Sequence, residues 1–482
     1  MDLERLIATV APAEVLNPAA VDVTGLAYDT RDVSPGTLFF CMPGERVDRH
    51  DLAPQAVEAG AAALVVERPL DLAVPQLVVP DARVAMAPAA AEFFGHPSHE
   101  LTVSGVTGTN GKTTTAFLLF AILAAAGLRP GLLGTVEVRV GGERRPSIRT
   151  TPEAIDLQRT LREMLDAGDR SCALEATSHG SAHHRLDCTR YAVLVFTNLS
   201  QDHLDLHGTM ERYYDAKRRL FVEADPAPAA VNVGDEYGRR LADELGSLGR
   251  APLTTFAVEG RADVVPQGLE LGSHGIRMTA AGVEIASPLL GRFNVENVLG
   301  AVAAARMLDL SPEAIAYGVA SVRGVPGRFE PVDEGQPFLV VVDYSHTPDS
   351  LENALRTARD LVSGRVICVF GCGGDRDRGK RPLMGRVAST ESDLAIVTSD
   401  NPRSEDPDAI IADVLEGVVG SVDVQPDRRL AILHAVESAR PGDLVLIAGK
   451  GHEQGQESKG STAPFDDREV ARDALRRLGA RA

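Results

Sequence analysis

The segment from residue 101 to residue 128 restricts the possible fold of this chain more than any other part of the sequence. It begins with a short apolar run at 101–106, passes through the stretch 107–114 (TGTNGKTT) and continues as an apolar run at 116–128. A strand, a glycine-rich loop and a helix in this order bring backbone N–H groups and a helix N-terminus around a phosphate group. The segment therefore predicts an α/β fold that contains a nucleotide loop.

Within this loop, Lys112 supplies a positive charge for the β- and γ-phosphates, and the Thr113 hydroxyl is suited to bind Mg²⁺. The match to the pattern G-x-x-x-x-G-K-[ST] is imperfect, because position 106 is valine and the glycine stands at 105. We interpret the loop as a variant nucleotide loop. The alternative is a glycine-rich turn between a strand and a helix, with an exposed lysine.

The composition limits the possible partners of the chain. Asp and Glu number 68 and Lys and Arg 49, which gives a net charge of −19 and argues against general nucleic-acid binding. The apolar run at 116–128 is too short to cross a bilayer, which takes about 20 residues, and the N-terminus lacks the basic region of a signal peptide. The 5 cysteines lack the spacing of a disulfide framework or a zinc site. These features predict a cytoplasmic protein without membrane insertion.

The 482 residues divide into three segments, with a linker expected at 95–98 and a polar break at 328–336. In the third segment we expect strands at 338–342, 366–370, 394–398 and 444–447, separated by helices such as 348–362 and 407–419. This alternation is typical of a parallel sheet, and ligands of such sheets bind at the carboxyl ends of the strands. Polar, glycine-rich clusters follow these four strands at 343–348, 371–377, 400–403 and 449–453.

Candidate metal ligands follow two expected strands of the second segment. Glu175 stands at the end of the strand expected at 171–176 and His179 follows it, and His203 and His207 follow the strand expected at 192–197. The two histidines have a zinc-binding spacing, but position 204 is leucine instead of the glutamate of a zinc hydrolase. Carboxylates beside a nucleotide loop favour Mg²⁺. Lys217 stands in an expected helix at 213–221, and its local sequence by itself indicates a solvated basic face.

The clusters of the third segment combine basic and acidic groups. Arg376 and Arg403 are suited to pair with a carboxylate, and Glu453 is suited to receive an ammonium group. An amino acid carries both groups, so this segment predicts an amino-acid site.

Taken in chain order, these motifs resemble those of Mur ligases, and the resemblance covers nearly the whole chain. It rests on 108–114, 175–179, 198–207, Lys217, 294–297, 343–348, 371–377, 400–403 and 449–453. The resemblance implies an N-terminal UDP-substrate domain at 1–98, a central P-loop ATPase-type domain at 99–328 and a C-terminal Rossmann-like, amino-acid-binding domain at 329–482.

The resemblance also implies an activity. It is greatest to the members that join meso-2,6-diaminopimelate to the D-glutamyl γ-carboxylate of UDP-N-acetylmuramoyl-L-alanyl-D-glutamate through an acyl phosphate, in peptidoglycan synthesis. ATP and Mg²⁺ would be the cofactors, the partners would be small-molecule substrates, and the protein would be a monomer. Three alternatives remain at this point: the same ligase using L-lysine, a ligase similar to folylpolyglutamate synthetases, and a nucleotide-dependent switch without ligase chemistry.

The resemblance carries roles to individual residues of this sequence. It implies catalytic roles for Lys112, Glu175, His203 and Lys217, with Lys217 carbamoylated and Thr113, Glu175, His203 and the carbamate as metal ligands. ATP contacts would be Gly108, Thr109, Asn110, Gly111, Lys112, Thr113, Thr114, Asn294, Arg328 and Asp343. The UDP-linked substrate would contact Thr30, Thr150, Thr151, Thr177, His183 and Arg185. The diaminopimelate pocket would comprise Arg376, Asp400, Asn401, Pro402, Arg403, Gly449 and Glu453. Thr177 stands where the family often has Ser, and His183 where Gln is common.

Overall fold

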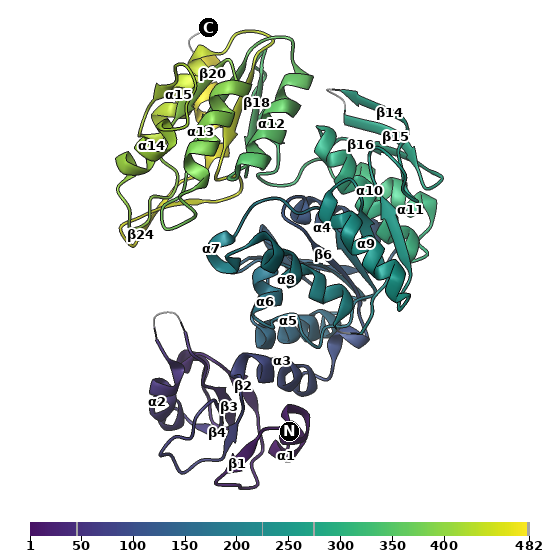
Figure 1. The fold of residues 1–482 in the computed structure, drawn as a ribbon, viewed down its shortest axis with the longest axis vertical. Helices are drawn as coiled ribbons and strands as arrows, with labels where there is room; N and C mark the ends of the chain where they lie inside the picture. The colour runs from purple at the N-terminus through teal and green to yellow at the C-terminus, as the bar shows by residue number, and fades with distance from the viewer. Residues whose placement is uncertain (45–46, 224, 273–274, 480–482) are drawn as a thin grey trace.

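The computed structural model describes residues 1–44, 47–223, 225–272 and 275–479 as three α/β bodies that follow one another along the long axis of the molecule (Figure 1). Figure 1 shows the N-terminal body at the bottom, the central body in the middle and the C-terminal body at the top. Of the helices in the described part of the chain, none is long and apolar enough to cross a membrane.

The N-terminal body is built on a sheet with the strand order β1-β5-β4-β3-β2, in which only the β1–β5 pairing is antiparallel. Its strands are β1 (Glu14–Leu16), β2 (Gly25–Ala27), β3 (Thr37–Phe40), β4 (Ala61–Val66) and β5 (Gln76–Val78). Its α-helices are α1 (Leu3–Val10), α2 (Ala53–Glu58) and α3 (Ala82–Phe93). The expected linker at 95–98 leads into a short 3₁₀ turn, η3 (Pro97–His99), directly before the central body.

The central body contains a sheet with the order β13-β12-β11-β6-β10-β7-β8-β9, and the strands from β13 to β7 are parallel. Its strands are β6 (Thr102–Thr107), β7 (Pro130–Leu133), β8 (Glu137–Val140), β9 (Glu143–Pro146), β10 (Ser171–Glu175), β11 (Val193–Phe196), β12 (Ala229–Asn232) and β13 (Leu253–Phe256). Its helices include α4 (Lys112–Ala125), α5 (Ala154–Asp166), α6 (Ser178–Ala182), α7 (Leu204–His207), α8 (Met210–Val222) and α9 (Glu236–Leu248). The strand, loop and helix predicted around residues 101–128 are confirmed.

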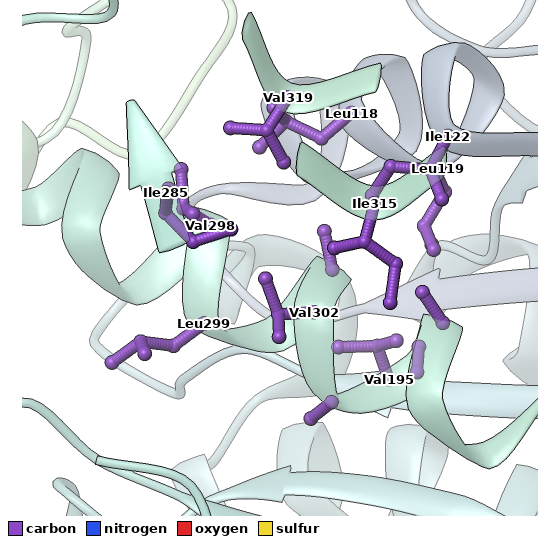
Figure 2. Packing of buried hydrophobic residues seen from close by; sticks show 14 of the residues in the cluster. Leu118, Leu119, Ile122, Val195, Ile285, Val298, Leu299, Val302, Ile315 and Val319 are labelled. Carbon is purple, nitrogen blue, oxygen red and sulfur yellow. The ribbon is translucent and has the colours of Figure 1, made fainter. Parts of the chain in front are cut away.

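Helix α4 is apolar on nearly all sides because it is packed between the sheet and other helices. Leu118, Leu119 and Ile122 of α4 meet Ile315 and Val319 of α11 in one buried cluster (Figure 2). This cluster also takes in α10 (Arg292–Met307), α11 (Pro312–Ser321) and a small antiparallel sheet of β14 (Gln267–Gly272), β15 (Gly275–Ala280) and β16 (Val283–Ser287). The packing fixes the N-terminus of α4 against the end of β6.

The C-terminal body has the strand order β17-β18-β22-β19-β20-β21, parallel except at β17. Its strands are β17 (Glu330–Pro331), β18 (Leu339–Asp343), β19 (Val366–Phe370), β20 (Leu394–Val397), β21 (Asp423–Val424) and β22 (Leu444–Ala448), followed by the hairpin β23 (Gly455–Ser458) and β24 (Ser461–Pro464). Its helices are α12 (Pro348–Leu361), α13 (Lys380–Glu391), α14 (Pro407–Leu415), α15 (Arg428–Ser438) and α16 (Asp467–Gly479). The four predicted strands and the parallel sheet are confirmed, and α14 ends earlier than expected, at Leu415.

Candidate active site

The loop between β6 and α4 is held in a conformation that requires glycine. Gly108 and Gly111 have φ values of 146° and 85°. A Cβ atom on Gly108 would lie 1.8 Å from Thr197 Oγ1, and one on Gly111 would lie 2.1 Å from Asn297 Oδ1. Gly111 is the N-cap of α4, so the N–H groups of the first helical turn, which have no partners within the helix, face the loop. This is the geometry of a phosphate cradle.

Two lysine side chains donate hydrogen bonds to the backbone of this loop. Lys112 Nζ donates hydrogen bonds to the carbonyl oxygens of Gly108 and Thr109, at 3.0 and 2.7 Å. Lys217 Nζ, from α8, donates to the same Gly108 oxygen at 2.7 Å. The Lys217 side chain is buried, so the interpretation of this residue as part of a solvated basic face is wrong.

Burial and the nearby Lys112 charge lower the pKa of Lys217 well below its ordinary value. The ring of Tyr213 lies 4.6 Å from Lys217 Nζ and forms one wall of this buried site. Burial lowers the pKa of Lys112 as well. The site therefore favours the neutral form of the Lys217 amine more than water does.

Glu175, at the end of β10, lies beside the phosphate cradle. Its Oε2 accepts hydrogen bonds from Thr113 Oγ1 at 3.1 Å and from Thr135 Oγ1 at 2.9 Å, and its Oε1 accepts from the Thr135 N–H at 2.7 Å. Arg328 Nη2 donates to the same Thr113 hydroxyl at 3.1 Å. A hydroxyl and a buried carboxylate in contact at the start of α4 are oxygen ligands of the type that Mg²⁺ takes.

His203 lies close enough to Lys112 and Lys217 for their charges to act on its ring, but it is not part of a preformed metal cage. Its ring stands 4.6 Å from the ring of His179, and its Nε2 lies 3.4 Å from Asp202 Oδ2. Burial lowers the pKa of His203 to about 3. His207 Nε2 is engaged with Ser178 Oγ at 3.1 Å. Among the described residues, no three His, Cys, Asp or Glu side chains converge on one point, so an ion here would need the Thr113 hydroxyl and ligands from a bound substrate or water.

The residues predicted for the UDP-linked substrate fall in two places. Four of them surround the end of β10: Thr150, Thr151, Thr177 and Arg185. Thr151 Oγ1 donates a hydrogen bond to the Glu175 carbonyl at 2.7 Å, and Thr177 Oγ1 donates one to Thr151 Oγ1 at 2.9 Å. Thr150 Oγ1 lies 3.1 Å from Thr135 Oγ1, and Arg185 Nη2 pairs with Glu153 at 3.0 Å. His183 is the C-cap of α6. Thr30 begins the 3₁₀ turn η1 (Thr30–Asp32) of the N-terminal body.

The three residues predicted on the adenosine side lie where the central and C-terminal bodies meet. Asn294, in α10, is buried and donates through Nδ2 to the Leu290 carbonyl at 2.7 Å. Asp343, at the end of β18, accepts from the N–H groups of Phe329 and Ser345 at 2.6 and 2.9 Å. The guanidinium of Arg328 stacks on the ring of Tyr344 at 4.5 Å.

The predicted amino-acid residues gather at the carboxyl ends of β20 and β22. Asn401 Nδ2 donates to Glu453 Oε2 at 2.7 Å, and the buried Lys450 donates to Asn401 Oδ1 at 2.8 Å and to Glu453 Oε2 at 3.1 Å. A Cβ atom on Gly449, at φ 118°, would lie 2.5 Å from Asp400 Oδ2. Pro402 is buried in this turn, and Arg376 is exposed at its edge.

Arg403 adopts a left-handed backbone conformation, with φ 52°. Its Nε pairs with Glu457 at 3.1 Å and its Nη1 donates to the Gly374 carbonyl at 2.7 Å. Asn401, Arg403 and Glu453 line a cavity of about 680 Å³. Its opposite wall is formed by residues 135–137 and 144–147 of the central body, so the cavity joins the two bodies.

Sequence reasoning missed several residues of this site. Lys450 was seen only as part of a cluster of mixed charge, and Thr135 was not singled out. Asp349 and Ser200 were missed as well: Asp349 Oδ2 accepts hydrogen bonds from Asn110 Nδ2 at 2.8 Å and from Ser200 Oγ at 3.0 Å. The local signal at Asp349 is only that of an acid in the first turn of a helix.

These three bodies, with a phosphate cradle facing a cleft between domains, have the architecture of an ATP-dependent amide ligase. Family models match at residues 22–95 (Mur ligase family, catalytic domain), 106–305 (Mur ligase middle domain) and 327–451 (Mur ligase, glutamate ligase domain). The chain belongs to the Mur ligase family.

Individual relatives match over nearly the full length. The UDP-N-acetylmuramoyl-L-alanyl-D-glutamate–2,6-diaminopimelate ligase of Solibacter usitatus is 45% identical over 494 residues, with 99% of each chain covered. A solved structure of a ligase with the same name matches at 34% identity and a TM-score of 0.68, with 95% of each chain covered. The MurF ligase of Thermotoga maritima, solved in complex with ADP, shares the fold at 19% identity and a TM-score of 0.64.

Proposed function

We propose that this protein is the ATP-dependent ligase that adds meso-2,6-diaminopimelate to the D-glutamyl γ-carboxylate of UDP-N-acetylmuramoyl-L-alanyl-D-glutamate in peptidoglycan synthesis. One structural observation carries the proposal. A cavity of about 680 Å³ brings the Asn401–Arg403–Glu453 group of the C-terminal body opposite Thr135, which is bonded to Glu175 beside the phosphate cradle. An amino acid bound in this cavity would face the site of acyl activation.

In the first half of the reaction, the substrate γ-carboxylate attacks the γ-phosphorus of ATP, forming an acyl phosphate and releasing ADP. Residues 108–114 would hold the phosphates, with the Lys112 ammonium neutralising charge on the transferred group. Asn294, Arg328 and Asp343 would contact the adenosine side. Thr113, Glu175 and His203 would hold Mg²⁺, whose role when bound is to neutralise phosphate charge.

Lys217 is proposed to be carbamoylated. Its burial and low pKa support this, because only the neutral amine attacks CO₂: an N–C bond forms and one proton leaves. The carbamate would be an anion facing the cradle, suited to hold a second Mg²⁺.

In the second half, the amine of diaminopimelate attacks the acyl carbon, and phosphate leaves. Arg403 and Arg376 would bind carboxylates of the amino acid. Asp400, Asn401, Glu453 and the backbone of Pro402 and Gly449 would shape the pocket and receive the distal ammonium group. Thr30, Thr150, Thr151, Thr177, His183 and Arg185 would hold the UDP-linked substrate.

The division into a UDP-substrate domain at 1–98, an ATP domain at 99–328 and an amino-acid domain at 329–482 belongs to the same proposal. We also propose that the protein acts as a cytoplasmic monomer. Light scattering coupled to size exclusion would test the monomer, and a dimer mass would contradict it.

ADP release, measured with the UDP-linked dipeptide and a panel of amino acids, tests the function. We expect release that depends on both the dipeptide and meso-diaminopimelate. Equal rates with L-lysine would support the lysine-adding alternative, and activity with a folate and glutamate would support the folylpolyglutamate alternative. ATP hydrolysis indifferent to every amino acid would support a nucleotide switch.

A further inference from the structure

A carboxylate of the C-terminal body reaches into the nucleotide loop of the central body. Asp349 lies in the first turn of α12, after the N-cap Thr347 and its capping box with Ser350. Its Oδ2 accepts from the side chains of Asn110 and Ser200, at 2.8 and 3.0 Å. Asn110 belongs to the phosphate loop, and Ser200 follows β11, which lies beside β6 in the central sheet.

Hydrogen bonds within the central body hold Asn110 and Ser200, the two partners of Asp349, in place. The Asn110 N–H donates to Asn198 Oδ1 at 2.9 Å, and the Ser200 N–H donates to Thr109 Oγ1 at 3.0 Å. Both partners of Asp349 are therefore fixed to each other through the backbone of the two loops. A carboxylate that binds both side chains fixes the start of α12 relative to the cradle.

The contact leaves the phosphate cradle open. Asp349 uses an amide and a hydroxyl from side chains, whereas a phosphate at the start of α4 would use backbone N–H groups and Lys112. The carboxylate and a nucleotide can thus occupy the loop together. The geometry does not require Asp349 to block nucleotide binding.

The same segment leads to the amino-acid pocket. Between β18 and α12, Tyr344 stands with its ring 5.1 Å from that of His452, and His452 lines the cavity with Glu453. A shift of α12 would therefore also displace this wall of the cavity.

We propose that Asp349 is a positioning residue that docks the amino-acid-binding body onto the nucleotide loop, so that the second half of the reaction follows the first. This inference rests on the proposed function. It separates the two halves: the acyl phosphate forms at the cradle of the central body, where the C-terminal body supplies only the proposed Asp343 contact on the adenosine side, whereas attack by the amine needs the whole amino-acid pocket of the C-terminal body in place. Loss of Asp349 should harm the second half selectively.

The test compares Asp349→Ala and Asp349→Asn with Glu352→Ala, an acid on the same helix that pairs with Arg356. The first half of the reaction is measured without amino acid and with the UDP-linked dipeptide present. The measured quantity is the exchange (scrambling) of an oxygen isotope between the bridging and non-bridging positions of ATP. We expect Asp349→Ala to lower kcat/KM for diaminopimelate by about tenfold or more while scrambling stays within about twofold of native. Asp349→Asn, which keeps an acceptor oxygen, should recover part of the loss, and Glu352→Ala should behave as native.

The Asp349 carboxylate also stabilises the N-terminus of α12 through the helix dipole. Asp349→Ala removes this stabilisation, so the variant can fail to fold. Ser200→Ala then decides, because it removes one donor without touching the helix. It should lower kcat/KM for diaminopimelate in the same direction, and its effect should be smaller in the double variant with Asp349→Asn than in the native background.

Native kcat/KM in Asp349→Ala, or equal loss of scrambling and of overall turnover, would overturn the inference. In Ser200→Ala, native kcat/KM or a matching loss of scrambling would overturn it in the same way. Absence of diaminopimelate-dependent ADP release in the native protein would instead overturn the proposed function.

Discussion

Lys217 and Lys112 donate hydrogen bonds to one backbone oxygen, the carbonyl of Gly108, at 2.7 and 3.0 Å. Two ammonium groups on one acceptor in a buried site repel each other, and this repulsion is one reason why the pKa of Lys217 is low. Converting one of them into an anion would change repulsion into attraction. The pair therefore links the chemical state of Lys217 to the position of Lys112.

Lys112→Ala should lower the rate of ADP release by about 10²–10³-fold while the fold is kept. In the proposed reaction this charge would face the transferred phosphoryl group, and such a loss costs about 2.7–4 kcal/mol, or roughly 10²–10³ in kcat. The measurement is turnover at saturating ATP, with thermal unfolding as the control for folding. Near-native turnover would contradict the role given to this lysine.

Lys217→Ala should be nearly inactive and partly rescued by formate or acetate. A small carboxylate can enter the space left by the side chain and replace the anion of a carbamate. In the native protein, ¹³C NMR after incubation with labelled bicarbonate should show a carbamate resonance that is missing in the variant. Full activity of the variant without any additive would exclude the proposed modification.

Arg403→Ala should raise the KM for diaminopimelate and leave ATP binding unchanged. Removing one partner of a bidentate charge pair costs about 2–4 kcal/mol, or roughly 30- to 1,000-fold. L-Lysine lacks the distal carboxylate, so the native protein should use it very poorly and the variant should lose most of this preference. Asp408→Asn, a nearby surface change, is the control. Comparable kcat/KM for the two amino acids in the native protein would show that the pocket is wrongly assigned.

The burial of His452 should lower the free energy of unfolding of the protein as the pH falls below 7. Burial lowers its pKa to about 3, from an ordinary value near 6.5. Above pH 6.5 the ring is neutral in both states; as the pH falls, the unfolded chain binds the proton first, so stability declines until the folded ring also titrates near pH 3. Between pH 7 and 5 this amounts to at most about 2 kcal/mol. Urea unfolding at both pH values should show a smaller decline for His452→Asn, and an identical decline would contradict the assignment.

Arg428 and Asp467 form a fully buried ion pair that joins the start of α15 to the start of α16. Two hydrogen bonds connect the side chains, at 2.8 and 2.7 Å, and both side chains are 0% exposed. Asp467→Asn should cost about 3–5 kcal/mol of unfolding free energy, because a buried guanidinium loses its counter-charge. The double change Arg428→Met with Asp467→Leu should cost less, and calorimetry of both variants measures the difference. Equal melting temperatures for the native protein and Asp467→Asn would argue against a charged pair.

The sequence predicted the phosphate loop and the parallel strands because these features are local. The apolar runs around Val106 and Leu446 have the length of buried strands, and the glycines at 108 and 111 mark the turn. The β14–β16 sheet was not predicted, although Ile276, Met278, Val283 and Ile285 alternate with other residues and are buried in it. The β23–β24 hairpin was not predicted because its strands are at most half-buried and carry no apolar alternation.

Site residues could be predicted where a motif at a strand end marks them, and not where only a partner in another part of the fold gives them their role. Asn401 and Glu453 stood out because each follows a strand of one sheet. Lys217 did not stand out from its local sequence and was named only through the resemblance to Mur ligases, because its partner, the Gly108 carbonyl, lies 109 positions away in sequence. Asp349 was hidden for the same reason: its partners Asn110 and Ser200 lie in another body.

The place of β22 in the C-terminal sheet determines the order in which the three bodies can fold during translation. β22 is hydrogen-bonded to both β18 and β19, although it comes after β20 and β21 in the chain. Until it leaves the ribosome, β18 and β19 each expose an apolar edge with no strand between them. The N-terminal and central bodies can fold as they emerge, whereas the last body must wait for nearly the whole polypeptide. Nascent chains stalled before residue 444 should therefore be bound by chaperones at their C-terminal third and be cut there by proteases.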